Sequence, residues 1–328
     1  MWGVARIPAG VTHHPQVTKA SVTLRRLEYF LSSCFRSWAP VPGGALSNQL
    51  AFPQKTPAVD DALAAGTDII VASVNGDPRY TPMVEPWFRF WRAMAEVSQR
   101  SITPVVIAFD AVSSSFRAED RGSIIYAQSP PGVPSALAAQ MSRIVWPGTL
   151  PAASSSVITT DVDMFPLSMR VIDVAKAKPA GSFVVARNVL EHDQQFPICY
   201  NVASPSVWRE VFSSTDDFAS DLRRATITPA EYSGDHGGTG WFIDQEFLYQ
   251  RATAWESDGG KLVRLTDEET GHRRLDRTSS QLRTLVTCPL VARQRWTDYH
   301  AYSPSTRSRA LNSWILFWLS RQTERPKR

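Results

Sequence analysis

The chain has 328 residues, of which 43% are hydrophobic and 20% are charged. This composition is close to the globular average, so most of the chain should bury a core, and general disorder is excluded. The net charge is only +4, and no basic stripe interleaved with aromatic residues runs through the central region. These features argue against a nucleic-acid-binding protein and fit a small anionic ligand better.

Three cysteines without CxxC spacing indicate neither a zinc site nor a disulfide framework. The longest apolar stretch near the C-terminus, WILFWL at 314–319, is far shorter than the roughly 20 residues that cross a bilayer. We therefore expect no transmembrane segment. The compartment stays unknown, and a soluble protein would be cytoplasmic, or organellar if its first residues are a targeting peptide.

The composition divides the chain into three regions. Residues 1–66 are rich in Pro, Ser, Ala and Arg, with Glu28 the only acidic residue before Asp60. This is typical of a poorly ordered or targeting-like extension, and a mobile extension without targeting value fits equally well. We expect one globular domain over residues 67–305, followed by a C-terminal helix and basic tail over residues 306–328.

Strand and helix patterns alternate along the central region. An apolar run at 69–72 ends at the turn-forming NGDP of 75–78, a helical pattern covers 86–97, and a second apolar run covers 104–109. Together they predict a βαβ unit. A helix at 134–145, a β-branched strand at 157–160, a strand at 182–186 and a helix at 206–212 continue the alternation. The prediction is an α/β fold with a mostly parallel central sheet flanked by helices.

Two aspartates follow the predicted strand at 157–160. Asp161 and Asp163 lie two positions apart at its carboxyl end, the edge where open α/β sheets bind ligands. Mg²⁺ or Mn²⁺ takes one or two carboxylates from a protein and completes its shell with water and substrate phosphates. Because the flanking residues are apolar, an unpaired charge would be costly there, which favours a functional role over a simple turn. The DxD pair predicts a metal-diphosphate site.

Six segments, read in chain order, resemble the GT-A class of nucleotide-sugar glycosyltransferases, and in particular a glycosyltransferase domain found in large algal viruses. They span the expected globular domain and are ASVNGDPRY (72–80), VITTDVDMFPL (157–167), FPICYNVASP (196–205), WFIDQ (241–245), RLDR (274–277) and DYH (298–300). The resemblance implies the GT-A fold, a UDP- or GDP-sugar donor, and Mn²⁺ or Mg²⁺ held by Asp161, Asp163 and the late His300.

The resemblance also implies roles for three further residues. Asn75 is expected near the nucleotide base, and Arg143 is expected to face the donor. Asp244 stands where the family has an acceptor-side acid, which makes it the candidate general base of an inverting transfer to a glycan or other hydroxyl acceptor. The order of Gly76 and Asp77 departs from the family pattern, so the base preference stays open.

Other classes fit the motifs less well. A sugar-nucleotide pyrophosphorylase normally has a glycine-rich basic loop after the first strand, and the NGDP turn is not that loop. A haloacid-dehalogenase-type phosphatase needs Thr or Ser after the DxD, where this chain has Met164 and Phe165. A non-catalytic sugar-nucleotide or carbohydrate-binding protein of the same fold stays open.

Overall fold

The structure is a computed structural model that describes residues 56–111, 115–116, 120–215, 217–225, 232–233, 237–276, 296–301, 312–314 and 317. Within these residues, seven strands form one sheet in the order β3-β2-β1-β4-β7-β6-β8. From first to last in the chain they are β1 (Asp68–Asn75), β2 (Ile102–Phe109), β3 (Ile124–Ala127), β4 (Val157–Thr159), β6 (Ser182–Val185), β7 (Asn201–Ala203) and β8 (Lys261–Arg264).

The sheet is mostly parallel. β1 pairs in parallel with β2 and with β4. β2 also pairs in parallel with β3, and β6 pairs in parallel with β8. β7 runs opposite to both of its neighbours, β4 and β6. The inner six residues of β1 are all buried, as expected of a strand covered on both faces. The predicted α/β class, with a mostly parallel central sheet flanked by helices, is confirmed.

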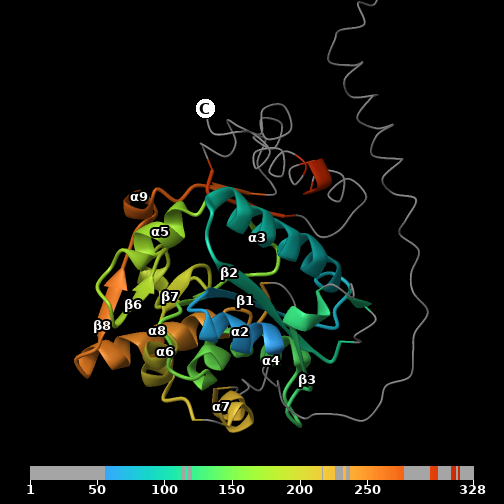
Figure 1. Cartoon of the computed structure of the whole chain (residues 1–328). Coiled ribbons are helices and arrows are strands. Elements are labelled where there is room, and N and C mark those ends of the chain that lie inside the picture. Colours follow the sequence, from blue (N-terminus) through green and yellow to red (C-terminus); the bar gives the residue numbers. More distant parts are fainter. Residues whose placement is uncertain are drawn as a thin grey trace, which may run out of the picture. The chain divides into compact units, whose positions relative to one another are not determined.

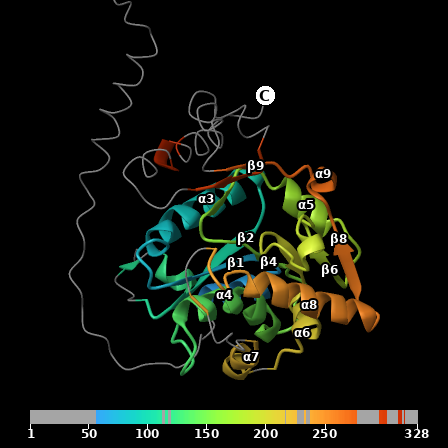
Figure 2. The ribbon, with the colours of Figure 1, turned by 180° about the vertical axis from the view of Figure 1, so that it is seen from behind.

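Helices cover both faces of the sheet (Figures 1 and 2). Ile70, Ala72 and Val74 of β1 belong to one buried cluster, whereas Ile69 and Val71 belong to the other, because successive side chains of a strand point to opposite faces. The first cluster includes residues of α3 (Val84–Ser98) and α5 (Arg170–Lys176). The second includes residues of α4 (Ser135–Val145), α6 (Pro205–Phe212), α7 (Phe218–Ala225) and α8 (Ile243–Ser257).

The described fold starts before residue 67. Residues Pro57–Ala64 form helix α2, and its side chains Val59 and Ala62 are buried in the second cluster. This helix falls inside the range 1–66 that composition assigns to an extension. Polar and small residues dominate the helix, so its two buried positions give little signal in the sequence. Residues 1–55 lie outside the described residues, as does most of the predicted C-terminal helix and tail.

A second, smaller sheet brings late residues beside the DxD pair. Within the described residues it has three strands in the order β5-β10-β9, namely β5 (Met164–Pro166), β10 (Asp298–His300) and β9 (Arg274–Leu275). β10 is antiparallel to β5, with His300 opposite Met164, and parallel to β9. Because β5 directly follows Asp163, this pairing fixes His300 next to the DxD. None of the helices in the described parts is long and apolar enough to span a membrane.

Phe165 joins this small sheet to the core. It is completely buried, its ring stacks on Phe90 of α3 with centroids 4.5 Å apart, and it meets Tyr299 edge-on. We expect Phe165→Ala to lower the free energy of unfolding by about 3–5 kcal/mol in urea denaturation, because it leaves a cavity in a close-packed core. Arg89→Ala, on the exposed face of α3, is the control and should change it by less than about 0.5 kcal/mol. Equal losses in the two variants would contradict this packing role.

Candidate active site

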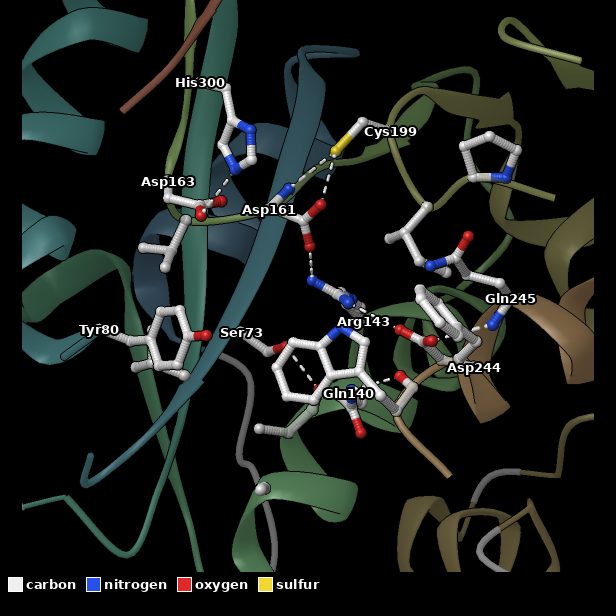
Figure 3. Close-up of a pocket in the computed structure, with 18 of the residues that line it drawn as sticks. Ser73, Tyr80, Gln140, Arg143, Asp161, Asp163, Cys199, Asp244, Gln245 and His300 are labelled. Carbon is white, nitrogen blue, oxygen red and sulfur yellow. Dashed lines mark hydrogen bonds and ion pairs between the residues drawn. The ribbon is translucent and has the colours of Figure 1, made fainter. Parts of the chain in front are cut away.

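A cavity of about 450 Å³ lies where the carboxyl ends of β1 and β4 meet (Figure 3). Its wall contains all six residues that the sequence assigns to the site: Asn75, Arg143, Asp161, Asp163, Asp244 and His300. Asn75 ends β1, and Asp161 and Asp163 lie in the turn between β4 and β5. Helices α4 and α8 supply one side chain each, and β10 of the small sheet supplies His300. The fold therefore brings together residues up to 225 positions apart, from 75 to 300 in the sequence.

Asp161 is held by two side chains. Its Oδ1 accepts a hydrogen bond from Nη1 of Arg143, and its Oδ2 accepts one from the Cys199 thiol at 3.1 Å. The backbone N–H of Asp161 in turn donates to the Cys199 sulfur at 3.1 Å. Burial would raise the pKa of Asp161, but the Arg143 charge and the Cys199 hydrogen bond hold it below the usual value. Asp161 is thus a carboxylate that stays ionised.

Arg143 connects the DxD pair to Asp244. Its Nη2 donates to Oδ2 of Asp244 at 2.7 Å, while Nη1 contacts Asp161. The Arg143 side chain is only 11% exposed and that of Asp244 is 2% exposed, so their ion pair is shielded from water, whereas the Asp161 carboxylate is 37% exposed. Burial alone would lower the pKa of Arg143, but the two carboxylates raise it above the ordinary value and keep the guanidinium charged. The row Asp161, Arg143 and Asp244 crosses the floor of the cavity (Figure 3).

Asp244 is the second residue of α8 and is 1% exposed. Besides accepting from Arg143, it accepts a hydrogen bond from the backbone N–H of Gln245 at 2.9 Å through Oδ1. Burial raises the pKa of Asp244, while Arg143 opposes the shift. A carboxylate with a raised pKa is a better proton acceptor than an ordinary one. Asp244 lies in the cavity wall with both of its oxygens engaged, and its role as the acceptor-side acid stays a prediction.

Asp163 and His300 lie side by side. His300 Nε2 is 3.1 Å from Oδ2 of Asp163, and His300 Nδ1 is 3.3 Å from Oδ2 of Asp276. A histidine whose second nitrogen faces a carboxylate is the usual arrangement for a metal-ligating imidazole, because the outer carboxylate fixes the ring and its tautomer. Asp163 and His300 therefore fit two ligands of a divalent cation.

Asp161, the third predicted metal ligand, does not point toward the other two. The Asp161 carboxylate turns toward Arg143 and Cys199, whereas Asp163 turns toward His300 (Figure 3). Among the described residues, no group of three or more His, Cys, Asp or Glu side chains has a geometry that would hold a metal ion. A cation at this place would hence start from two protein ligands.

The opposite end of the cavity is formed by the loop after β1. Asn75 ends the strand and its amide donates to the Ser135 hydroxyl at 3.5 Å, at the start of α4. Asp77 and Arg79 form an ion pair, and Tyr80 follows them in the cavity wall. Asn75 thus lies in the cavity wall at the end of β1 and not in the loop itself, and its contact with a nucleotide base stays a prediction.

Trp241, three residues before Asp244, also lies in the cavity wall. Its carbonyl accepts a hydrogen bond from Gln140 of α4 at 2.9 Å, and Gln140 in turn accepts one from Tyr232 at 2.8 Å. Burial raises the pKa of Tyr232 to about 12, so this phenol remains a donor at neutral pH. The tie to α4 fixes the segment that leads into Asp244.

Sequence reasoning missed three lining residues, Cys199, Arg187 and Arg274. Cys199 belongs to a quoted motif, yet only the structure shows that its sulfur holds Asp161. Arg187 follows β6 and is bound through two hydrogen bonds to Asp267. A single basic residue after a strand matches no motif, so the sequence could not predict a role for Arg187. Arg274 was included only as part of the RLDR motif.

No protein-family model and no curated protein matches the chain. Among solved structures, the galactosyltransferase LgtC, in complex with donor and acceptor sugar analogues, is 11% identical, with 79% of this chain and 97% of that chain covered and a TM-score of 0.40. The glycosyltransferase GlyE from Streptococcus pneumoniae TIGR4 is 12% identical, with 79% of this chain and 65% of that chain covered and a TM-score of 0.43. The bifunctional glycosyltransferase WbbM is 11% identical, with 78% of this chain and 51% of that chain covered and a TM-score of 0.42. These values are too low to assign the chain to a family, and the likeness to algal-virus domains stays a prediction.

Proposed function

We propose that the chain is a metal-dependent glycosyltransferase of the GT-A class, which moves a sugar from a UDP- or GDP-sugar to a hydroxyl acceptor such as a glycan. The observation that carries the proposal is the pairing of Asp163 with His300 at 3.1 Å, at the carboxyl edge of a mostly parallel sheet and in the wall of a cavity. Ligands of open α/β sheets bind at this edge.

Asp163 and His300 would hold Mn²⁺ or Mg²⁺, and Asp161 would join them on leaving Arg143. When bound, the cation neutralises the negative charge that develops on the departing nucleoside diphosphate. His300 is kept in place by Asp276 and by the pairing of β10 with β5. The residues of this chain thereby orient the leaving group before any bond breaks.

Asp244 would accept the proton of the acceptor hydroxyl, which corresponds to inversion at the anomeric carbon. Its raised pKa suits a general base, and Arg143 ties its position to that of Asp161. Asn75 and the loop after β1 would contact the base, and Arg143 would face the donor on losing Asp161. The exposed ring of Phe242, next to Trp241, offers an apolar surface for a sugar ring at the cavity mouth.

A thermal-shift titration with UDP and GDP, with and without Mn²⁺, tests the proposal. A ligand present at 100 times its Kd stabilises a folded protein by about 2.7 kcal/mol. For a domain of this size that raises Tm by roughly 5–10 °C. We expect this shift with one of the nucleotides and Mn²⁺, and less than half of it in EDTA. If neither nucleotide shifts Tm with Mn²⁺, the proposed donor class is wrong.

Binding alone would not separate a transferase from a non-catalytic protein of the same fold or from a pyrophosphorylase. Release of nucleoside diphosphate from UDP- and GDP-sugars identifies a transferase. Release of nucleoside triphosphate on addition of pyrophosphate identifies a pyrophosphorylase. Tight binding without either product identifies a binding protein.

A further inference from the structure

Arg274 and His300 are neighbours on the small sheet. β9 and β10 run in parallel, with Arg274 opposite Asp298 in the register. Two cross-strand side-chain contacts follow one another, Arg274 with Asp298 at 3.4 Å and Asp276 with His300 at 3.3 Å. The same short strands therefore carry a candidate metal ligand and a guanidinium, and both line the cavity.

The partner of Arg274 is rigidly held. Asp298 is completely buried, and its Oδ2 accepts hydrogen bonds from the Tyr200 hydroxyl at 3.2 Å and pairs with Nε2 of His272 at 3.0 Å. Asp298 therefore lies behind Arg274 with its carboxylate held in place by two other side chains.

The same histidine extends this support to a second arginine. His272 Nδ1 is 3.3 Å from Oδ2 of Asp267, which binds Arg187 through two hydrogen bonds of 3.0 Å. Arg187 and Arg274 both line the cavity, and each pairs with an aspartate that also contacts His272. His272 and Asp298 are buried, whereas 34% of the Asp267 side chain is exposed. Because His272 contacts both aspartates, the two guanidinium groups are held at defined places in the cavity wall.

Arg274 has hydrogen-bonding capacity to spare. Among the described residues, its guanidinium makes one hydrogen bond, the long 3.4 Å contact with Asp298, and 26% of its side chain stays exposed. Arg274 lines the same cavity as Asp161 and Asp163. The guanidinium therefore faces the same space as the DxD pair. Its planar fork of N–H groups matches phosphate oxygens.

We propose that the Arg274 guanidinium contacts the diphosphate of the sugar-nucleotide donor, in addition to the cation that Asp163 and His300 would hold. Asp298, which Tyr200 and His272 hold in place, positions Arg274. This inference rests on the proposed function, since it concerns the same donor. It adds a metal-independent part to donor binding. Asp298 acts through Arg274 and does not touch the donor.

The test is calorimetric titration of UDP and GDP into wild type, Arg274→Gln, Arg274→Lys and Arg273→Gln, each with Mn²⁺ and in EDTA. Arg273 is the matched control, because it is the neighbouring arginine and its side chain is exposed. We expect Arg274→Gln to weaken binding about ten- to hundredfold in both conditions, as for the loss of a charge-assisted hydrogen bond. Arg274→Lys should recover part of this loss, and Arg273→Gln should bind within twofold of wild type.

Positioning by Asp298 is tested by combining variants. Asp298→Asn should weaken nucleotide binding in the wild-type background, yet cost less than twofold when Arg274 is already Gln. A merely structural role would reduce affinity equally in both backgrounds. Circular dichroism and Tm confirm that each variant folds before it is titrated.

The outcomes separate the two proposals. If wild type binds UDP or GDP with Mn²⁺ but Arg274→Gln binds within twofold of it, the role of Arg274 is refuted and the proposed function stands. An equal loss in Arg273→Gln also refutes it, because a diffuse positive field would then account for the effect. If wild type binds neither nucleotide, both proposals fall.

Discussion

Asp163→Ala is expected to abolish sugar transfer, by at least about a thousandfold, and to remove Mn²⁺-dependent donor binding. Asp163 is the DxD carboxylate that meets His300, and the charge stabilisation supplied by a bound cation is worth several kcal/mol, with 1.36 kcal/mol for each tenfold in rate. The fold should survive, because the Asp163 side chain lies in the cavity wall and its ion pair with His300 is partly exposed.

Two comparisons make this result specific. Asp161→Ala should be nearly as severe, because it also leaves the buried Arg143 with one carboxylate partner in place of two. Asp173→Ala, which removes an exposed ion pair with Arg100, is the control and should retain wild-type turnover. Full Mn²⁺-dependent transfer by the Asp163→Ala protein would show that the DxD pair does not hold the cation.

His300→Ala and Asp244→Asn are expected to separate donor binding from the chemical step. His300→Ala removes an imidazole beside Asp163, so calorimetry should show weaker Mn²⁺ and donor binding together. Asp244→Asn removes a proton acceptor but keeps an oxygen for Arg143. Donor affinity should therefore stay within about threefold, while turnover falls by roughly 10²- to 10⁴-fold.

Glu246 offers a matched control for Asp244, because it lies in the same first turn of α8 but is exposed. Glu246→Gln should leave both donor affinity and turnover unchanged. If Asp244→Asn loses donor affinity as severely as His300→Ala, Asp244 acts by holding Arg143 and not as a base. Retention of anomeric configuration in the product would lead to the same conclusion.

The ion pairs across the cavity floor bear on this division of roles. Arg143 contacts a DxD aspartate with one nitrogen and Asp244 with the other. Movement of Asp161 toward a cation would leave Asp244 as the remaining carboxylate partner of Arg143. Cation binding at Asp161 would therefore change the ion pairing of Asp244, the candidate base, through the buried guanidinium of Arg143.

Local pattern predicted four of the seven described strands of the main sheet, and β3, β7 and β8 were missed. Continuous apolar runs identified β1 and β2, and the β-branched run identified β4, which ends two residues before Asp161. These signals are strong because a strand buried on both faces must be apolar throughout. α2 was missed because two buried side chains on a short helix leave almost no periodic signal.

The contacts within the site could not be predicted from local pattern. His300 reaches Asp163 because β10 pairs with β5, and a three-residue strand has no reliable sequence signature. The sequence predicted that Arg143 faces the donor, but not that it pairs with two carboxylates, because ion pairs between distant segments depend on tertiary packing. The sequence could name most of the site residues but not which of them touch.

The most direct test of metal-dependent sugar transfer is the release of UDP or GDP from a panel of their sugar conjugates, with hydroxyl acceptors present. Wild type and Asp163→Ala would be measured with Mn²⁺ and with EDTA. We predict acceptor-dependent release by wild type with Mn²⁺ and background release in the other three conditions. Release by wild type that is equal in Mn²⁺ and EDTA, or equal in the two proteins, would contradict the proposed function.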